Sequence, residues 1–476
     1  FSIICVLAVV HGAYPIQAFM QRAVIATTSV TSKLRTSSSS SISSPINNIV
    51  SKQATTFVNF APFAHHQRKR HIDKTRGIIT TTTAIMSSSS SNNNINNQPV
   101  IAYVVTLTGC GTNDKRYTRD SAMGLITQGA AVLRHSIHLA HTQSNKYGFQ
   151  MYAIVHPSAK ECSSTMSKLG YKTLIRNTPF DSKDIQKKFL RENIDGASCC
   201  GRKEFVKLYA YTLVDHPVAV VLDLDSLVLK PLDDLFDAII LEDYDILGSS
   251  IPIHDKKNVK NLPKKVDAFY TKDYNMVNAG GEKYAGVQGG FLMARPNEAV
   301  FEEYIDIVLE GDYREGKGWG GRYGYFFGGM QIQGICAYFY GERHPDMGIE
   351  LDRCRINSMV DSPTFKQDDR NKPGQCRDGR SNCEDCRTTE ISDIFSAHLT
   401  ICQKPWECIY GWDAKSEKLC SRLHSEWFRI RRSFEESREE DDGLRLLPDL
   451  GEAFKPDTYF GYCKRPGRGG YLPIKI

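Results

Sequence analysis

Short apolar runs alternate with stretches of helical periodicity between residues 101 and 248. The apolar runs are rich in β-branched residues, which is typical of buried strands; they lie at 101–108, 149–155, 172–175, 218–224 and 246–248. The stretches with helical spacing lie at 125–142, 159–169 and 205–214. Strands that alternate with helices predict an α/β fold with a mainly parallel sheet, in which ligands bind at the carboxyl ends of the strands.

One apolar run leads into a pair of acids. Asp223 and Asp225 are separated by one residue at the end of the run 218–224. Because side chains of a strand alternate between its two faces, both carboxylates are expected to point the same way. Unpaired, they would repel each other and be costly to desolvate. A divalent metal such as Mg²⁺ or Mn²⁺ removes that cost. The simpler alternative is a pair of solvated acids at a strand end.

A second group of candidate residues lies far downstream, at 398–406. His398 can supply a further metal ligand, and Lys404 can neutralise a phosphate as a point charge. Each residue alone is more simply a hydrogen-bonded loop histidine or a solvated lysine. Together with the aspartate pair, they favour a metal site that binds a diphosphate.

Four separated blocks resemble the family 8 glycosyltransferases, the group of glycogenin and galactinol synthase. The first is the strand at 102–108, and the second joins Phe205 and Lys207 to the two aspartates. The other two lie at 287–296, which contains Gln-Gly-Gly before a strand, and at 398–406. The resemblance covers residues 100 to about 412. It implies a GT-A fold, a Rossmann-like α/β sandwich built on a mixed, mainly parallel sheet flanked by helices.

The resemblance also implies roles for individual residues. The metal, Mn²⁺ or Mg²⁺, would be held by Asp223, Asp225 and His398. The residues expected to contact the donor are Leu107 and Thr108 at the uracil, Lys404 at the phosphates, Lys207 at the phosphate or sugar, and Gln288, Gly289 and Gly290 at the sugar. The catalytic set would be Lys207, Asp223 and Asp225, and the family retains the configuration of the transferred sugar.

The predicted activity is therefore the transfer of a hexose from a UDP-sugar to a carbohydrate or protein acceptor, with retention. Two positions depart from the family pattern. Ile401 stands where the family usually has glycine, and Ile332 stands where it often has aspartate. These departures leave open an alternative, a catalytically degenerate relative that binds a nucleotide sugar or a glycan. No nucleophile is evident among the predicted site residues.

Charge is distributed unevenly along the chain. Residues 20–99 hold nine Lys or Arg and one acid, whereas the whole chain has a formal net charge of +6. Residues 100–476 therefore carry a small net negative charge, which argues against a nucleic-acid surface. The apolar start, 1–19, resembles a signal-peptide core and allows membrane association. The Ser-, Thr- and Asn-rich arm that follows is predicted to be disordered.

The cysteines bear on the compartment. Of 14 cysteines, eight lie after residue 350. A dense, even set after a signal-like start favours disulfides in an oxidising lumen, which we expect to be the Golgi. The rival for Cys354, Cys376, Cys383 and Cys386 is a zinc site. The rival location is a plastid, because the Ser- and Arg-rich, acid-poor arm also resembles a transit peptide.

The expected domain organisation follows from these patterns. A signal-like segment at 1–19 and an arm or stem at 20–99 precede the transferase domain at 100–412, with a Cys-rich insertion at about 354–390. A helical extension occupies 413–476, because apolar residues recur at helical spacing over 417–436. Residues 252–286 are predicted to be a loop over the site. Residues 310–329 combine glycines with aromatics, either as simple loop packing or as a platform for a sugar acceptor.

Overall fold

The computed structural model describes most of the chain after residue 97: residues 98–110, 119–198, 200–242, 252–254, 265–277, 282–365, 373–412, 415–442 and 454–476. The predicted signal-like segment 1–19, nearly all of the arm at 20–99 and the expected strand at 246–248 lie outside these ranges. Within them, no helix has both the length and the apolar character needed to span a bilayer.

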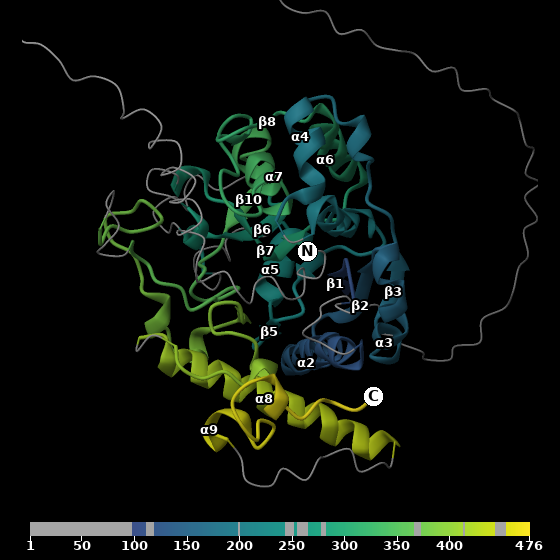
Figure 1. The fold of residues 1–476 in the computed structure, drawn as a ribbon, viewed down its shortest axis with the longest axis vertical. Coiled ribbons are helices and arrows are strands. Elements are labelled where there is room, and N and C mark those ends of the chain that lie inside the picture. The colour runs from purple at the N-terminus through teal and green to yellow at the C-terminus, as the bar shows by residue number, and fades with distance from the viewer. Residues whose placement is uncertain are drawn as a thin grey trace, which may run out of the picture. The chain divides into compact units, whose positions relative to one another are not determined.

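A mixed sheet of seven strands forms the centre of the fold (Figure 1). Its order is β10-β6-β7-β4-β1-β2-β3, with bounds Gly348–Glu350, Ala268–Lys272, Val287–Ala294, Ala219–Leu222, Val100–Leu107, Gly148–Val155 and Lys172–Ile175. β7 runs antiparallel to β4 and β6, whereas the other four pairings are parallel. The predicted α/β fold with a mainly parallel sheet is therefore confirmed.

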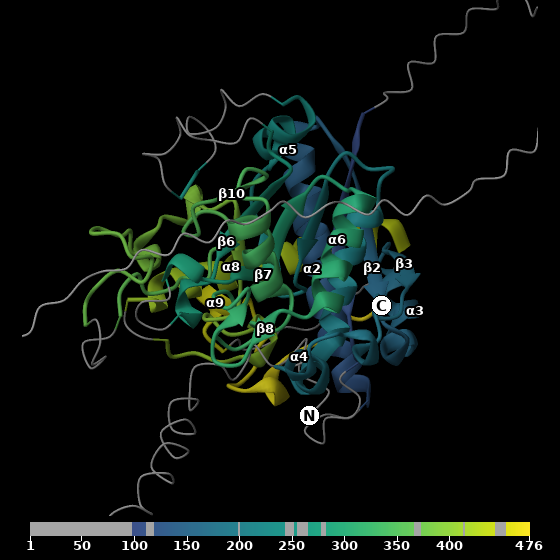
Figure 2. The same cartoon turned by 90° about the horizontal axis from the view of Figure 1, so that it is seen from above.

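Helices cover both faces of this sheet. Their bounds are α2 Arg119–Ser144, α3 Ser163–Lys168, α4 Lys188–Asn193, α5 Asp233–Ile240, α6 Glu298–Glu310, α7 Ile332–Tyr338, α8 Glu417–Asp442 and α9 Pro456–Tyr459. Figure 1 shows α6 above and α2 below the strands β1 and β2, and in the view from above the two helices are seen one behind the other (Figure 2). The helix expected at 205–214 is a 3-10 helix, Gly201–Thr212.

The sequence of β1 shows why two cores form. Ile101, Tyr103 and Leu107 belong to the apolar cluster that includes α2 and α8, whereas Ala102 and Val104 belong to the cluster on the opposite face. This two-residue alternation places apolar side chains on both faces, as expected of a strand covered on each side. The helix expected at 417–436 extends to Asp442, and its apolar positions pack into the first of these cores.

The prediction of a loop over 252–286 is wrong in part. Residues 268–272 form β6, which pairs in parallel with β10 and antiparallel with β7. The strand is short and lies between polar and glycine-rich flanks, so its apolar pattern is weak in the sequence. Its partners are also distant along the chain, and only tertiary pairing reveals it.

Disulfides, and not a zinc site, join the cysteines of the insertion. The pairs Cys354–Cys386 and Cys376–Cys383 use all four candidate zinc ligands. The other pairs between described cysteines are Cys110–Cys162, Cys402–Cys420 and Cys408–Cys463. The predicted disulfide framework is thus confirmed for the described residues, and Cys336 is a free, buried thiol.

Candidate metal and donor site

A small second sheet brings the distant histidine to the aspartates. β4 ends at Leu222, and a turn carries Asp223 and Asp225 into β5, Ser226–Val228. β5 pairs antiparallel with β11, Ser396–His398, in a register that sets His398 opposite Ser226. The Leu399 amide then donates to the Asp225 carbonyl at 2.9 Å. Backbone pairing therefore fixes the imidazole beside the acidic turn.

The aspartates lie in this turn and not on a strand. The Ser226 amide donates to the Asp223 carbonyl at 3.1 Å, which bends the chain after β4. The helix α2 approaches the turn closely, because a Cβ added at Gly129 would lie 2.6 Å from the Leu224 carbonyl oxygen. The carboxylates still converge, but through turn geometry and not through the alternation of a strand.

Three ligand atoms meet at this turn. The Nε2 atom of His398 lies 3.2 Å from the Oδ2 atom of Asp225 and 3.9 Å from that of Asp223. One ligand atom from each residue lies within 4.8 Å of the others, so the three side chains form a group that can hold a metal ion. Two carboxylates and an imidazole suit Mn²⁺, and the carboxylates also suit Mg²⁺.

The histidine itself supports a metal at this position. Its side chain is buried, yet neither ring nitrogen makes a well-aligned hydrogen bond with the described residues, although Nε2 lies 3.2 Å from the Asp225 carboxylate. Buried polar groups rarely remain without a partner, because the loss of hydration is costly. Gly290 also makes room for the ring, since a Cβ there would lie 2.5 Å from the imidazole. The three side chains Asp223, Asp225 and His398, and the room that Gly290 leaves for the ring, therefore fit a divalent cation.

Two lysines flank the acidic turn. The Lys207 ammonium donates to the Asp223 carboxylate at 2.9 Å and to the Gly289 carbonyl at 2.8 Å. Lys404 is fully buried; its ammonium donates to Asp225 and, at 2.9 Å, to the Leu399 carbonyl. Burial alone would raise the pKa of Asp225, but Lys404 and His398 hold that pKa below its usual value. Asp225 is thus kept ionised in a largely dry site.

The Gln-Gly-Gly segment begins β7, which runs antiparallel beside β4. The Gln288 side-chain oxygen accepts from the Gly290 amide at 2.6 Å and from the Asn357 amide group at 3.1 Å. Gln288 therefore makes hydrogen bonds within the protein that fix the conformation of the segment 288–290. Gly289 is the more open member, because only side-chain atoms at 3.4 Å or more lie around its Cβ position.

Leu107 and Thr108 occupy the carboxyl end of β1, next to β4 in the sheet. Leu107 is fully buried and packs in the core, whereas the Thr108 carbonyl accepts from the Ser158 hydroxyl at 2.9 Å. The disulfide Cys110–Cys162 ties the chain two residues further on. Both residues therefore lie at the carboxyl ends of the strands, where the nucleotide is expected, and the Leu107 side chain points into the core.

Sequence reasoning missed Glu204 and Gln333. The Glu204 carboxylate lies 3.5 Å from the Lys207 ammonium, and burial raises its pKa although Lys207 opposes this. Glu204, Lys207 and Gln333 all lie within 3.6 Å of the Cβ position of Gly289. The spacing of Glu204 and Lys207 on one helical turn was a local signal. Their meeting with β7 depends on tertiary structure.

A third missed residue is Asp273, which directly follows β6. Its side chain is buried and accepts from the Asn275 amide at 3.2 Å. Burial and the nearby Asp361 carboxylate raise the pKa of Asp273 to about 6, with His398 and Gln333 acting against the rise. The site therefore contains a carboxyl group that changes its charge close to neutral pH.

No protein-family model and no curated protein matches the chain. Among solved structures it is similar to mouse xyloside xylosyltransferase 1, with 11% identity over 63% of this chain and 97% of the other, and a TM-score of 0.36. It is also similar to the galactosyltransferase LgtC in complex with donor and acceptor sugar analogues, with 11% identity, coverage of 74% and 98%, and a TM-score of 0.37. A third is the glycosyltransferase GlyE of Streptococcus pneumoniae TIGR4, with 10% identity, coverage of 75% and 68%, and a TM-score of 0.34. Scores this low carry no weight for the function of this chain.

Proposed function

We propose that this protein is a metal-dependent glycosyltransferase that moves a hexose from a UDP-sugar to a carbohydrate or protein acceptor, with retention of configuration. The observation that carries the proposal is the convergence of Asp223, Asp225 and His398 at the end of β4, with a lysine on each side. Two carboxylates and an imidazole suit a divalent cation, and paired lysines suit the oxygens of a diphosphate.

Some residues of this chain would stabilise negative charge on the diphosphate, and others would position the donor. Asp223, Asp225 and His398 hold the cation, which when bound stabilises charge on the leaving diphosphate as a Lewis acid. Lys404 adds a fixed positive charge from a buried position, where it acts more strongly than in water. Lys207 stands on the other side of the turn, between Asp223 and the backbone of Gly289.

We assign the sugar of the donor to the surroundings of Gly289, where a Cβ would meet only side-chain atoms, at 3.4 to 3.6 Å. Absence of a side chain there leaves room close to the backbone. Glu204, Lys207 and Gln333 surround that position with one acceptor, one donor and one amide. Hydroxyl groups of a hexose require both donors and acceptors, and these three side chains provide both. No side chain in this group is assigned as a nucleophile.

One observation favours the second candidate, a degenerate relative that binds without turnover. Ile332 is buried and packs in the apolar core, so its position offers no carboxylate to the site. Transfer that needs an acid at position 332 would then fail. Glu204 and Asp273 are the nearby carboxyl groups that could take its place, and they keep the active transferase as the better-supported candidate.

Release of UDP tests the two candidates directly. Purified protein is incubated with UDP-glucose, UDP-galactose, UDP-glucuronate or UDP-N-acetylglucosamine, in Mn²⁺ and in EDTA. We expect Mn²⁺-dependent release from one donor, abolished in Asp223→Asn and kept in Asp215→Asn, a matched change at an exposed aspartate before β4. Calorimetric binding of UDP with Mn²⁺ but no release from any donor indicates the degenerate relative. Absence of both UDP binding and UDP release refutes the transferase and a relative that binds a nucleotide sugar, and leaves a relative that binds a glycan.

We also infer a luminal location in the secretory pathway, with the Golgi as the expected compartment. Five disulfide pairs among the described cysteines support this, because such bonds persist in oxidising compartments. A fluorescent fusion of the full-length precursor distinguishes the Golgi from the plastid, and plastid fluorescence would contradict the inference.

A further inference from the structure

Two exposed aromatic side chains lie close together in the chain, near the proposed donor site. Tyr325 is 54% exposed and Phe327 is 49% exposed. Of the large apolar side chains that are exposed among the described residues, these are the only aromatic ones. Both belong to the glycine loop, which we define as residues 318–329. Leaving two aromatic rings in water forgoes the free energy of burying them, about 25 cal/mol per Å² of apolar surface.

The glycine loop is held by a close backbone contact and by hydrogen bonds from two aromatic side chains. A Cβ added at Gly329 would lie 1.8 Å from the Gly324 carbonyl oxygen, so the two ends of the segment 324–329 touch. The Tyr313 hydroxyl donates to the Gly324 carbonyl at 2.7 Å, and the Trp319 ring N–H donates to the Gly329 carbonyl at 2.9 Å. The exposed rings therefore stand on a fixed base, which lowers the entropic cost of binding a ligand.

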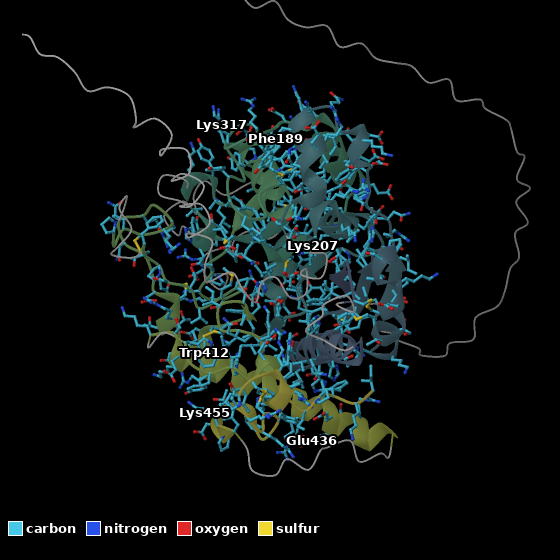
Figure 3. The ribbon with its side chains drawn as sticks, viewed as in Figure 1. Phe189, Lys207, Lys317, Trp412, Glu436 and Lys455 are labelled. Atoms are coloured by element: carbon cyan, nitrogen blue, oxygen red, sulfur yellow. A yellow bond between two sulfur atoms is a disulfide. The ribbon has the colours of Figure 1, made fainter. Side chains whose placement is uncertain are left out.

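The same loop adjoins the proposed sugar site. Phe326, between the two exposed rings, packs against Gly286, where a Cβ would lie 2.4 Å from its ring. Gly286 directly precedes β7, which carries Gln288, Gly289 and Gly290. On the other side, the Gln333 side chain lies beside both Gly328 and Gly289. The loop is thus one side chain away from the space assigned to the donor sugar. Figure 3 labels Lys207 at the site and Lys317, which directly precedes the loop, further toward the top of the view.

We propose that Tyr325 and Phe327 form an acceptor platform, on which a pyranose ring of a carbohydrate acceptor stacks. The inference rests on the proposed function and narrows its acceptor to a carbohydrate. The aliphatic C–H face of a pyranose carries partial positive charge and packs on the negative face of an aromatic ring, while its hydroxyl groups stay in water. Between residues 318 and 329 the only charged side chain is Arg322, so the loop offers little to bind a charged peptide.

Binding measured without catalysis tests the platform. Saturation-transfer NMR is run with maltose, lactose, xylobiose and methyl β-D-galactopyranoside as probes, in the presence of UDP and Mn²⁺. We expect at least one sugar to bind the wild type and to bind Tyr325→Ala/Phe327→Ala at least tenfold more weakly. Tyr325→Trp/Phe327→Trp should restore binding, because the rings and not the hydroxyl group carry it. The control Val214→Ala/Leu241→Ala removes two exposed apolar side chains elsewhere and should change nothing.

The outcomes separate this inference from the proposed function. Sugar binding that is equal in the wild type and the double alanine variant overturns the platform, as does binding of no probe by the wild type. Calorimetry of UDP with Mn²⁺ on the same proteins reports the donor site independently. If UDP binds and no sugar depends on the rings, the platform alone is wrong. If UDP does not bind but the rings hold a sugar, the rings bind carbohydrate, whereas the proposed function fails and with it the role of that sugar as an acceptor.

Discussion

The metal loop borders the acidic turn, the glycine loop adjoins the proposed sugar site at Gly289, and the two loops are held in place by different means. The metal loop, which we define as residues 398–408, carries His398 and Lys404, both almost completely buried, and the disulfides of Cys402 and Cys408 tie it to the C-terminal region. The glycine loop contains no cysteine and is held by close backbone contacts. Buried charges need fixed distances, whereas an exposed platform needs only a firm base. The first loop should therefore be sensitive to changes of its buried charged side chains, and the second tolerant of changes to its exposed rings.

The largest effect is expected at Asp225. The change Asp225→Asn removes the anionic partner of the fully buried Lys404, and an unpaired buried charge costs about 3–5 kcal/mol of unfolding free energy. It also removes a proposed metal ligand, so affinity for Mn²⁺ should fall by more than about 100-fold. Chemical denaturation measures the first effect, and titration with Mn²⁺ followed by electron paramagnetic resonance measures the second.

Asp223→Asn is the matched control. Asp223 is more exposed, and its partner Lys207 keeps Glu204 at 3.5 Å as a second carboxylate. We expect the same loss of Mn²⁺ affinity with a stability loss of only about 1.5 kcal/mol, as for one hydrogen bond to a charged group. Equal destabilisation by the two changes would contradict the view that Lys404 depends on Asp225 alone among carboxylates.

The next largest effect is expected when the disulfide Cys402–Cys420, which we call the clamp of the metal loop, is removed. Cys402→Ala/Cys420→Ala opens a disulfide with a sequence separation of 18 and should cost about 3 kcal/mol in the chain-entropy model. Because the clamp fixes the loop that carries His398 and Lys404, Mn²⁺ affinity should fall as well. Cys376→Ala/Cys383→Ala opens a separation of 7 in the insertion, should cost about 2 kcal/mol and should leave Mn²⁺ affinity unchanged. A similar loss of affinity in both variants would show that the clamp has no special link to the metal site.

The attachment of the metal loop to α8 should also depend on pH. His424 of α8 is fully buried and donates to the Cys402 carbonyl at 2.9 Å. Burial lowers its pKa to about 4, although hydrogen bonds to the carbonyls of Gln403 and Cys402 oppose this. Between pH 4 and the ordinary value of 6.5 the unfolded chain binds more protons than the folded one, so stability falls as pH falls.

Denaturation at two pH values measures this effect. Relative to pH 7.5, His424 should cost about 2 kcal/mol at pH 5. The variant His424→Gln keeps a donor for the Cys402 carbonyl but cannot titrate, and it should lose correspondingly less stability between the two pH values. The glycine loop contains no histidine and no acid, so Arg322→Gln should leave the pH profile as it is. An unchanged profile in His424→Gln would refute the assignment.

The sequence predicted the parts of the site that depend on local pattern or on motif blocks. The α/β alternation and the acidic pair at Asp223 and Asp225 are visible in the chain. The chemistry of His398 made it a candidate ligand, and the resemblance assigned it to the same proposed metal. The turn after Leu222 was not predictable, because Leu222-Asp223-Leu224-Asp225 keeps the apolar–polar alternation of a strand and gives no sign that the strand ends. β6 was missed for a similar reason, since a five-residue strand between polar flanks is identified only by its partners.

The residues around Gly289 show a second limit of prediction from the sequence. Glu204 and Gln333 are 129 positions apart, and they meet because β7 runs antiparallel beside β4 while the 3-10 helix and α7 pack on the same face. Nothing local in either residue's neighbourhood signals this meeting. Tyr325 and Phe327 are different again: their aromatic and glycine context was visible, but the exposure that distinguishes a platform from loop packing is a property of the folded chain.

The smallest effect is expected on the glycine loop itself. Tyr325→Ala removes a side chain that is 54% exposed, so the free energy of unfolding should change by no more than about 0.5 kcal/mol. Trp319→Ala, on the same loop, should cost about 3–5 kcal/mol, because that ring is fully buried and holds the Gly329 carbonyl. Thermal or urea denaturation of both variants measures these changes in the free energy of unfolding. A loss above 1.5 kcal/mol in Tyr325→Ala would mean that its ring packs within the fold. The exposed pair would then be structural, and the contrast between a loop built on buried charge and a loop built to present aromatic rings would no longer hold.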